Sequence, residues 1–213
     1  MRTAYLAVLA ILIISLAIAA YAYPQVPDNV PSHWNAAGDV DGYMDRFWGL
    51  FLFPIILIPL ILLFIAIPRI DPLKKNVAKF RAYFDGFIVI FAVFMFYVQL
   101  LTTAWALGYT FNMMVALMPA FAMLFFYCGI LMEKSKRNWF IGIRTPWTLS
   151  SDRVWEKTHR LGGKMFKAAA VISLLGIAAG EYAIWVLLVP VLVAAFYPMV
   201  YSYFEYQKIK KKR

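Results

Sequence analysis

The side chains that could do chemistry gather in a polar stretch near the N-terminus, residues 24–46. Asp39 and Asp41 lie two residues apart just before a glycine, as at the start of a calcium loop, but the twelfth position counted from Asp39 is an apolar leucine, which excludes an EF-hand. A looser metal site that adds His33 and Asp45 stays open. So do a turn in which the Asp side chains bond to the backbone and a surface that recognises an extracellular molecule.

The histidines and the cysteine argue against several enzyme classes. The two histidines, His33 and His159, are expected on opposite sides of a membrane, which excludes a two-His zinc site. Neither histidine has a serine in a recognisable nucleophile motif nearby. The single cysteine, Cys128, lies in an apolar run and is expected to be an inert thiol. We therefore predict a chain that needs no cofactor and is not an enzyme, with a metal-assisted intramembrane enzyme as one alternative.

The composition requires a lipid environment for these side chains. Of the 213 residues, 63% are hydrophobic and 15% charged, and the mean hydropathy is +0.71. A soluble fold of this length could not bury so much apolar surface. The net charge of +10 would suggest nucleic acid in a soluble protein. Here the Lys and Arg residues flank hydrophobic runs, so they are expected to meet lipid headgroups instead, without direct contact with nucleic acid.

Apolar runs of suitable length divide the chain into membrane spans. A span needs about 20 apolar residues. The first run exceeds the usual signal-peptide core of roughly 7–15 residues, so we predict a retained helix. The sequence predicts an all-α, polytopic membrane protein with about six transmembrane helices. The expected spans are residues 3–23, 47–67, 86–107, 113–132, 166–180 and 182–204.

The distribution of positive charge predicts the orientation. With the N-terminus in the cytoplasm, 20 of the 21 Lys and Arg residues face the cytoplasm, and Arg46 lies outside. Both termini are therefore predicted to be cytoplasmic in a multi-pass protein of the cell membrane. We expect two units. Residues 1–68 form a two-helix hairpin with an extracellular Pro-, Gly- and Asp-rich loop (24–46), and residues 69–213 form a four-helix region with a basic cytoplasmic loop (133–165).

The polar residues of the spans bear on transport. We find no ionisable side chain at mid-membrane depth, which weighs against ion-coupled transport. Gln99, Thr102 and Thr103 share one face of the third span and are expected to make interhelical hydrogen bonds. They would also begin a polar path in the alternative of a transporter or exporter of a peptide or lipid.

A short helix is expected inside the basic loop. Ser151 is a suitable N-cap for residues 152–161, which combine a Trp155-bearing apolar face with a basic face. Gly162 and Gly163 are expected to end this helix. Such a helix suits either a connector resting on the membrane interface or a docking surface for a cytoplasmic partner.

Two stretches resemble known families. Residues 24–42, with the pattern Pro-x-x-Pro-x-x-x-Pro-x-His-Trp-Asn-x-x-Gly-x-x-Asp-Gly, resemble an uncharacterised N-terminal domain of small bacterial and archaeal membrane proteins. Residues 137–150 read Arg-Asn-Trp-Phe-Ile-Gly-Ile-Arg-Thr-Pro-Trp-Thr-Leu-Ser, and residues 154–163 read Val-Trp-Glu-Lys-Thr-His-Arg-Leu-Gly-Gly. Both of these runs are similar to the SdpI family.

The resemblance implies a membrane protein of immunity or signal-transduction type. In this family's best-known role, the protein protects the cell from a secreted peptide toxin and sequesters a cytoplasmic repressor. The outer loop would then bind the extracellular ligand and the inner loop a cytoplasmic regulator, while the sequence leaves the oligomeric state open. The expected ligand-binding residues are His33, Trp34, Asn35, Gly38, Asp39, Asp41 and Gly42. The expected docking residues are Asn138, Trp139, Gly142, Arg144, Thr145, Pro146, Trp147, Trp155, Glu156, His159 and Arg160.

Overall fold

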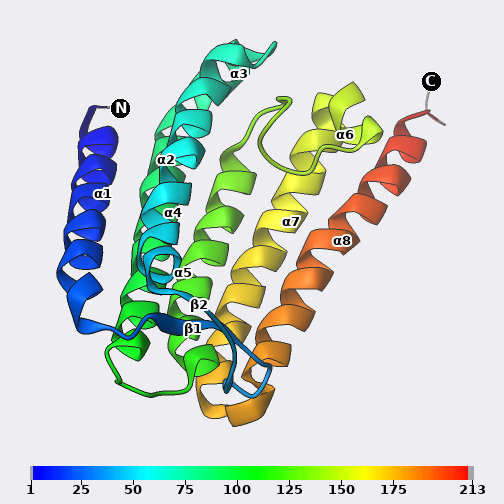
Figure 1. The fold of residues 1–213 in the computed structure, drawn as a ribbon. Helices are drawn as coiled ribbons and strands as arrows, with labels where there is room; N and C mark the ends of the chain where they lie inside the picture. The colour runs from blue at the N-terminus through cyan, green and yellow to red at the C-terminus, as the bar shows by residue number, and fades with distance from the viewer. Residues whose placement is uncertain (1, 211–213) are drawn as a thin grey trace.

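Six long apolar helices dominate the computed structural model, which describes residues 2–210 (Figure 1). Each is long and apolar enough to cross a membrane, which confirms the predicted all-α polytopic fold. They are α1 (Arg2–Ala22), α2 (Arg46–Ile70), α4 (Arg81–Ala106), α5 (Met113–Lys134), α7 (Asp152–Ser173) and α8 (Ala183–Lys210).

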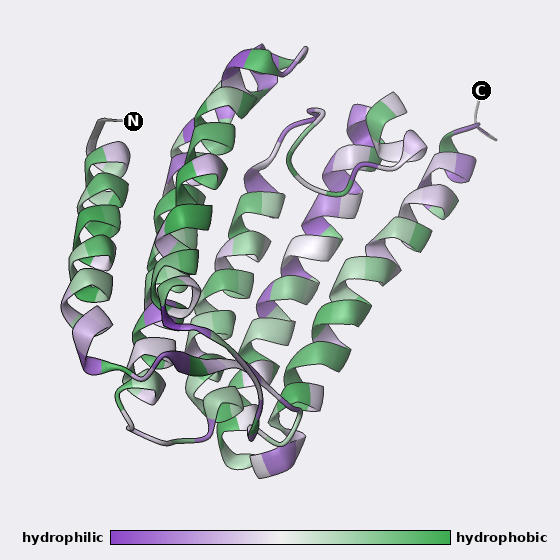
Figure 2. Cartoon of the chain, in the orientation of Figure 1, coloured by the Kyte–Doolittle hydropathy of each residue, from purple (hydrophilic) through white to green (hydrophobic). Residues whose placement is uncertain are grey.

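Short elements gather at the two ends of the bundle. Figure 1 shows α3 and α6 at the end where α1 begins and α8 finishes, and the strands β1 and β2 toward the opposite end. Figure 2 shows hydrophobic residues along the helices and hydrophilic residues near both ends. The short elements are η1 (Tyr23–Gln25), β1 (Asn29–Trp34), β2 (Val40–Asp45), α3 (Lys74–Lys79), α6 (Pro146–Ser150), η2 (Leu174–Ala178) and η3 (Gly180–Tyr182).

The outer loop forms a β-hairpin, where the sequence predicted only turns. Strands β1 and β2 pair antiparallel, from Asn29 opposite Asp45 to Trp34 opposite Val40. The hairpin is fixed to the bundle by Val30, which is 1% exposed and packs in a cluster with residues of α1 and α2. The prolines that suggested an irregular loop are compatible with it, because a two-stranded sheet consists of edge strands.

The expected break at Gly162 and Gly163 is wrong. Helix α7 runs without interruption from Asp152 to Ser173, so the expected interfacial helix is the first half of a longer span. The glycines serve close packing instead. A Cβ atom on Gly163 would lie 2.6 Å from the carbonyl oxygen of Gly129 on α5, and a Cβ on Gly129 equally close to the carbonyl of Gly163. Small residues let neighbouring helices approach in this way.

Interhelical hydrogen bonding was expected for Gln99, Thr102 and Thr103 on α4, and it is confirmed for Gln99. Gln99 is fully buried, and its Nε2 donates to the carbonyl oxygens of Ser15 on α1 (2.9 Å) and Leu50 on α2 (3.3 Å). The Ser15 hydroxyl donates to Gln99 Oε1. Thr102 instead donates to the carbonyl of Gln99 within its own helix, and the hydroxyl of Thr103 has no partner among residues 2–210. The amide therefore holds three helices together rather than beginning an open polar path.

Candidate functional site

The tip of the outer hairpin is built by two of the predicted ligand-binding residues. Asn35 Oδ1 accepts hydrogen bonds from the backbone N–H groups of Ala37 (2.9 Å) and Asp39 (3.0 Å). Gly38 has a φ of +94°, and a Cβ there would lie 2.6 Å from Asn112 Oδ1. Asn112 Nδ2 in turn donates to the Ala37 carbonyl at 3.0 Å. Asn35 and Gly38 therefore shape the turn, and Asn112 ties it to the start of α5.

The strands present an exposed His–Asp pair. His33 Nδ1 lies 2.5 Å from Asp41 Oδ1, and the two side chains are 71% and 45% exposed. Gly42 allows this arrangement, because a Cβ there would lie 2.9 Å from His33 Cβ. With the exposed Asp39 at the tip, these two residues form the part of the predicted ligand-binding set that is accessible from outside.

Trp34 faces the bundle rather than the solvent. Its ring packs edge-on against Trp105 of α4, with the centroids 6.0 Å apart. Trp34 also lines a cavity of about 260 Å³ beneath the hairpin, together with Thr102 and Met113. Its indole N–H is buried and finds no acceptor within residues 2–210. Trp34 thus supports the hairpin from below.

The acidic residues of the outer loop do not converge. Asp45 caps α2 by accepting the N–H of Phe47 at 2.8 Å, and Asp28 pairs with Arg46 at 3.3 Å. Within the described part of the chain, no group of three or more His, Cys, Asp or Glu side chains is placed to hold a metal ion. The looser metal site of His33, Asp39, Asp41 and Asp45 is therefore not assembled.

On the side that is predicted to be cytoplasmic, Asn138 organises the loop between α5 and α6. It is fully buried, and its Oδ1 accepts the N–H groups of Phe140 (2.9 Å) and Ile141 (2.6 Å). Its amide nitrogen donates to the carbonyls of Lys136 (2.9 Å) and Ile141 (3.0 Å). Both ends of this side chain are used within its own loop, so Asn138 fixes the local backbone.

His159 and Gly142 join that loop to α7. His159 Nε2 accepts the N–H of Ile143 at 2.9 Å, so it carries no proton, and Nδ1 then donates to the carbonyl of Trp155 at 2.9 Å. The Trp155 ring stacks on the imidazole at 3.9 Å, and its N–H donates to the Ser135 carbonyl at 3.2 Å. Gly142 has a φ of +104°, and a Cβ there would lie 2.3 Å from His159 Nε2.

Two threonines connect the loop to α6 and α8. Thr145 caps α6 in a capping box with Thr148, whose hydroxyl also donates to the carbonyl of Ile143 at 2.8 Å. The Thr145 hydroxyl lies 2.9 Å from the hydroxyl of Ser202 on α8. This fixes the position of α6 relative to the last span.

Burial divides the predicted docking residues into buried, half-buried and exposed groups. Asn138, Thr145, Trp155 and His159 are buried and shape the loop from within. Trp147 is half-buried, with its ring 5.1 Å from that of Tyr203. The exposed members, which a cytoplasmic partner could contact, are Trp139, Gly142, Arg144, Pro146, Glu156 and Arg160.

Asp71 is a residue of this site that the sequence reasoning missed. Its side chain is 2% exposed, and Oδ2 accepts the N–H of Trp139 at 2.9 Å while Oδ1 accepts the N–H of Leu73 at 2.6 Å. Nearby, Asn76 Nδ2 donates to the carbonyl of Arg137 at 2.9 Å. The turn after α2 is thereby bonded to the basic loop. The sequence feature that could have indicated this role is a single acidic residue among the basic residues of the segment 69–79.

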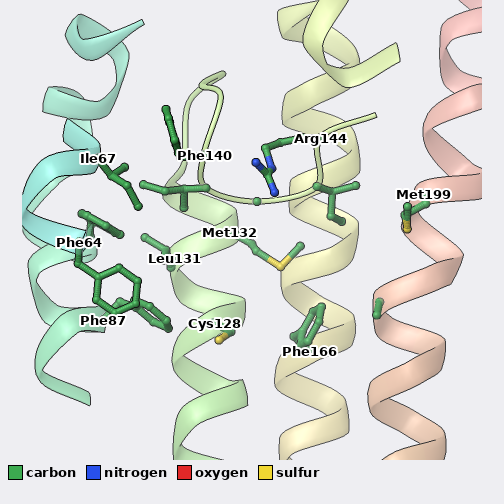
Figure 3. A pocket seen from close by; sticks show the side chains of 15 residues that line it. Phe64, Ile67, Phe87, Cys128, Leu131, Met132, Phe140, Arg144, Phe166 and Met199 are labelled. Atoms are coloured by element: carbon green, nitrogen blue, oxygen red, sulfur yellow. The ribbon is translucent and has the colours of Figure 1, made fainter. Parts of the chain in front are cut away.

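A cavity of about 530 Å³ lies beneath this loop, between the span ends that are predicted to be cytoplasmic. Figure 3 shows aromatic and aliphatic side chains around it, with Arg144 projecting from the loop. Its lining includes Phe64, Phe87, Leu131 and Met132.

Comparisons with known proteins match both halves of the chain. The model of the SdpI/YfhL protein family matches residues 134–202, and DUF1648, a domain of unknown function, matches residues 10–58. The chain is 26% identical over 192 residues to the Immunity protein SdpI of Bacillus subtilis (strain 168), covering 90% of each protein. The chain is therefore similar to the SdpI/YfhL family over residues 134–202. No solved structure matches it.

The two matched regions contain the two candidate surfaces, the outer hairpin and the basic inner loop. The DUF1648 region contains the outer hairpin with parts of α1 and α2. The SdpI/YfhL region contains the basic loop, α6, α7 and much of α8. The protein is thus a multi-span membrane protein similar to a membrane immunity protein, with the DUF1648 region on the outer side and the SdpI-like loop on the inner side of the predicted topology.

Proposed function

We propose that this protein is a non-enzymatic immunity protein of the cell membrane that protects its host against a secreted peptide toxin. The observation behind this proposal is the alignment with an immunity protein over 90% of both chains. An alignment of that extent leaves only about a tenth of each chain unmatched, so it supports a shared mode of action better than a single shared motif would.

The outer hairpin is the proposed toxin-binding surface. Its backbone is held by Asn35 and Asn112, which leaves His33, Asp39 and Asp41 exposed on a pre-formed support. Pre-organisation lowers the entropic cost of binding. A carboxylate pair beside an imidazole favours a peptide that offers positive charge or hydrogen-bond donors.

The inner loop is the proposed docking surface for a cytoplasmic regulator. Trp139 is 51% exposed, and the exposed Glu156 forms an ion pair with Lys136 at 2.7 Å. Arg160 is exposed one turn further along α7. An exposed tryptophan with charged neighbours is a common composition for a protein-binding surface.

Expression in a toxin-sensitive Bacillus strain tests the proposal. The strain lacks its own immunity gene and is challenged with the sporulation-delaying peptide toxin, while membrane abundance is followed by immunoblotting. We expect survival to rise relative to cells with an empty vector. Equal killing at good membrane abundance would reject protection against this toxin.

A further inference from the structure

The proposed function makes no use of the cavity beneath the inner loop. Its volume of about 530 Å³ lies within the range of about 300–1,000 Å³ that is usual for small-molecule sites. The side chains that surround it come from α2, α4, α5, α7 and α8 and from the loop (Figure 3). Apart from Arg144, the lining side chains are aromatic, aliphatic or sulfur-containing.

The lining residues place this cavity at the inner leaflet of the membrane. Ile67 lies in the last turn of α2, Phe84 in the first turn of α4, and Leu131 in the last turn of α5. With the predicted topology, these are the cytoplasmic ends of three spans. Acyl chains meet lipid headgroups at this depth, so lipid is the most abundant molecule available to an apolar cavity here.

Arg144 gives the cavity one strong recognition element. Its Nη1 donates to the Trp139 carbonyl at 2.8 Å, and no carboxylate within residues 2–210 lies at ion-pair distance from it. Figure 3 shows the guanidinium pointing from the loop toward the cavity lining. A guanidinium has five N–H donors in a planar fork that matches phosphate. The remaining donors are free to bind an anion.

We propose that the cavity binds an anionic phospholipid of the inner leaflet, with one acyl chain among the apolar side chains and the phosphate on Arg144. A peptide fits less well, because its backbone N–H and C=O groups would need partners that the apolar lining does not offer. The basic cytoplasmic face of the protein would also concentrate anionic lipid near the site. This inference does not depend on the proposed immunity function.

Native mass spectrometry of the purified full chain, given phosphatidylglycerol or phosphatidylcholine in mild detergent, tests the proposal. The wild-type protein should retain phosphatidylglycerol in preference to phosphatidylcholine. Arg144→Gln should reduce retention of phosphatidylglycerol about tenfold, the effect of losing one charge-assisted hydrogen bond. The matched control is Arg153→Gln, which removes an exposed arginine that does not line the cavity, and it should retain the lipid as the wild type does.

A second variant tests the contribution of the cavity to lipid retention without changing the charge of Arg144. Ala195 lines the cavity from α8, so Ala195→Phe should fill part of it and reduce retention of both lipids. If Arg144→Gln fails to fold, unchanged phosphatidylglycerol retention by Ala195→Phe would overturn the proposal. Equal retention by Arg144→Gln and Arg153→Gln would also overturn it. So would displacement of the lipid by excess inorganic phosphate, since the site would then bind a free anion.

Discussion

Gly142 is required for two separate reasons, its backbone conformation and the close approach of a neighbouring side chain. The φ of +104° is costly for any other residue, and His159 Nε2 occupies the place of a side chain. Gly108 has a similar φ of +95°, but nothing lies within 4 Å of the position where its Cβ would be. Substitution of Gly108 therefore tests the cost of the positive φ alone, whereas substitution of Gly142 tests that cost together with the clash against His159.

We expect Gly142→Ala to lower the midpoint of thermal unfolding more than Gly108→Ala does. Both variants pay a backbone cost of about 1–3 kcal/mol. Gly142→Ala must also displace the imidazole and break its bond to the Ile143 N–H. Thermal unfolding in one detergent measures both variants. Equal shifts would show that the imidazole moves aside at no cost.

Buried residues explain why parts of the inner loop were read wrongly from the sequence. The run 137–163 resembles the SdpI family, and the sequence predicts that its polar residues form a surface. Asn138 and His159 are buried because the loop's own backbone groups satisfy their polar atoms. Hydrogen bonds of this kind depend on the folded loop, and no residue pattern specifies them.

At the scale of elements, the outer hairpin is held by Asn112, which lies at the start of a different helix. This side chain caps α5 by accepting the Val115 N–H at 3.0 Å, and it donates to the Ala37 carbonyl in the hairpin. One residue therefore orders two elements. The spacing of 75 residues between Asn112 and Ala37 puts this contact beyond the reach of sequence reasoning.

Asn112→Asp and Asn112→Ala should separate these two functions. Aspartate keeps the cap acceptor but loses the donor, whereas alanine loses both. We expect both variants to speed amide hydrogen exchange at residues 35–39. Only Asn112→Ala should speed exchange in the first turn of α5. Unchanged hairpin exchange in both variants would contradict the tethering role.

Asp71 performs a similar tethering role at the end of the bundle opposite the hairpin. Asp71→Ala leaves the N–H groups of Leu73 and Trp139 without their acceptor, which costs about 1–3 kcal/mol for a buried donor. We expect faster amide exchange at residues 137–141. The matched control is Asp152→Ala, which removes a 72% exposed carboxylate paired with Arg137 and should have a small effect. Equal effects of the two substitutions would contradict a special role for Asp71.

At the scale of the whole molecule, the number of spans could be predicted, because hydropathy is a property of the sequence alone. The positive-inside orientation stays a prediction. The β-hairpin could not be predicted, because its short strands depend on packing of Val30 against α1 and α2. The unbroken α7 was missed for a related reason. Gly162 and Gly163 resemble a helix end in sequence, and only the neighbouring α5 shows that they are packing residues.

Survival of toxin-challenged cells measures most directly whether the outer hairpin gives protection against a secreted peptide. The comparison is between Asp41→Ala and Asp28→Ala, which each remove one acidic residue from the outer side. Asp28 is 84% exposed but lies outside the predicted ligand-binding set. At equal membrane abundance, Asp41→Ala should lower the tolerated toxin dose about tenfold, as expected for one charge-assisted hydrogen bond, and Asp28→Ala should leave it unchanged. Equal protection by both variants would contradict recognition through the hairpin.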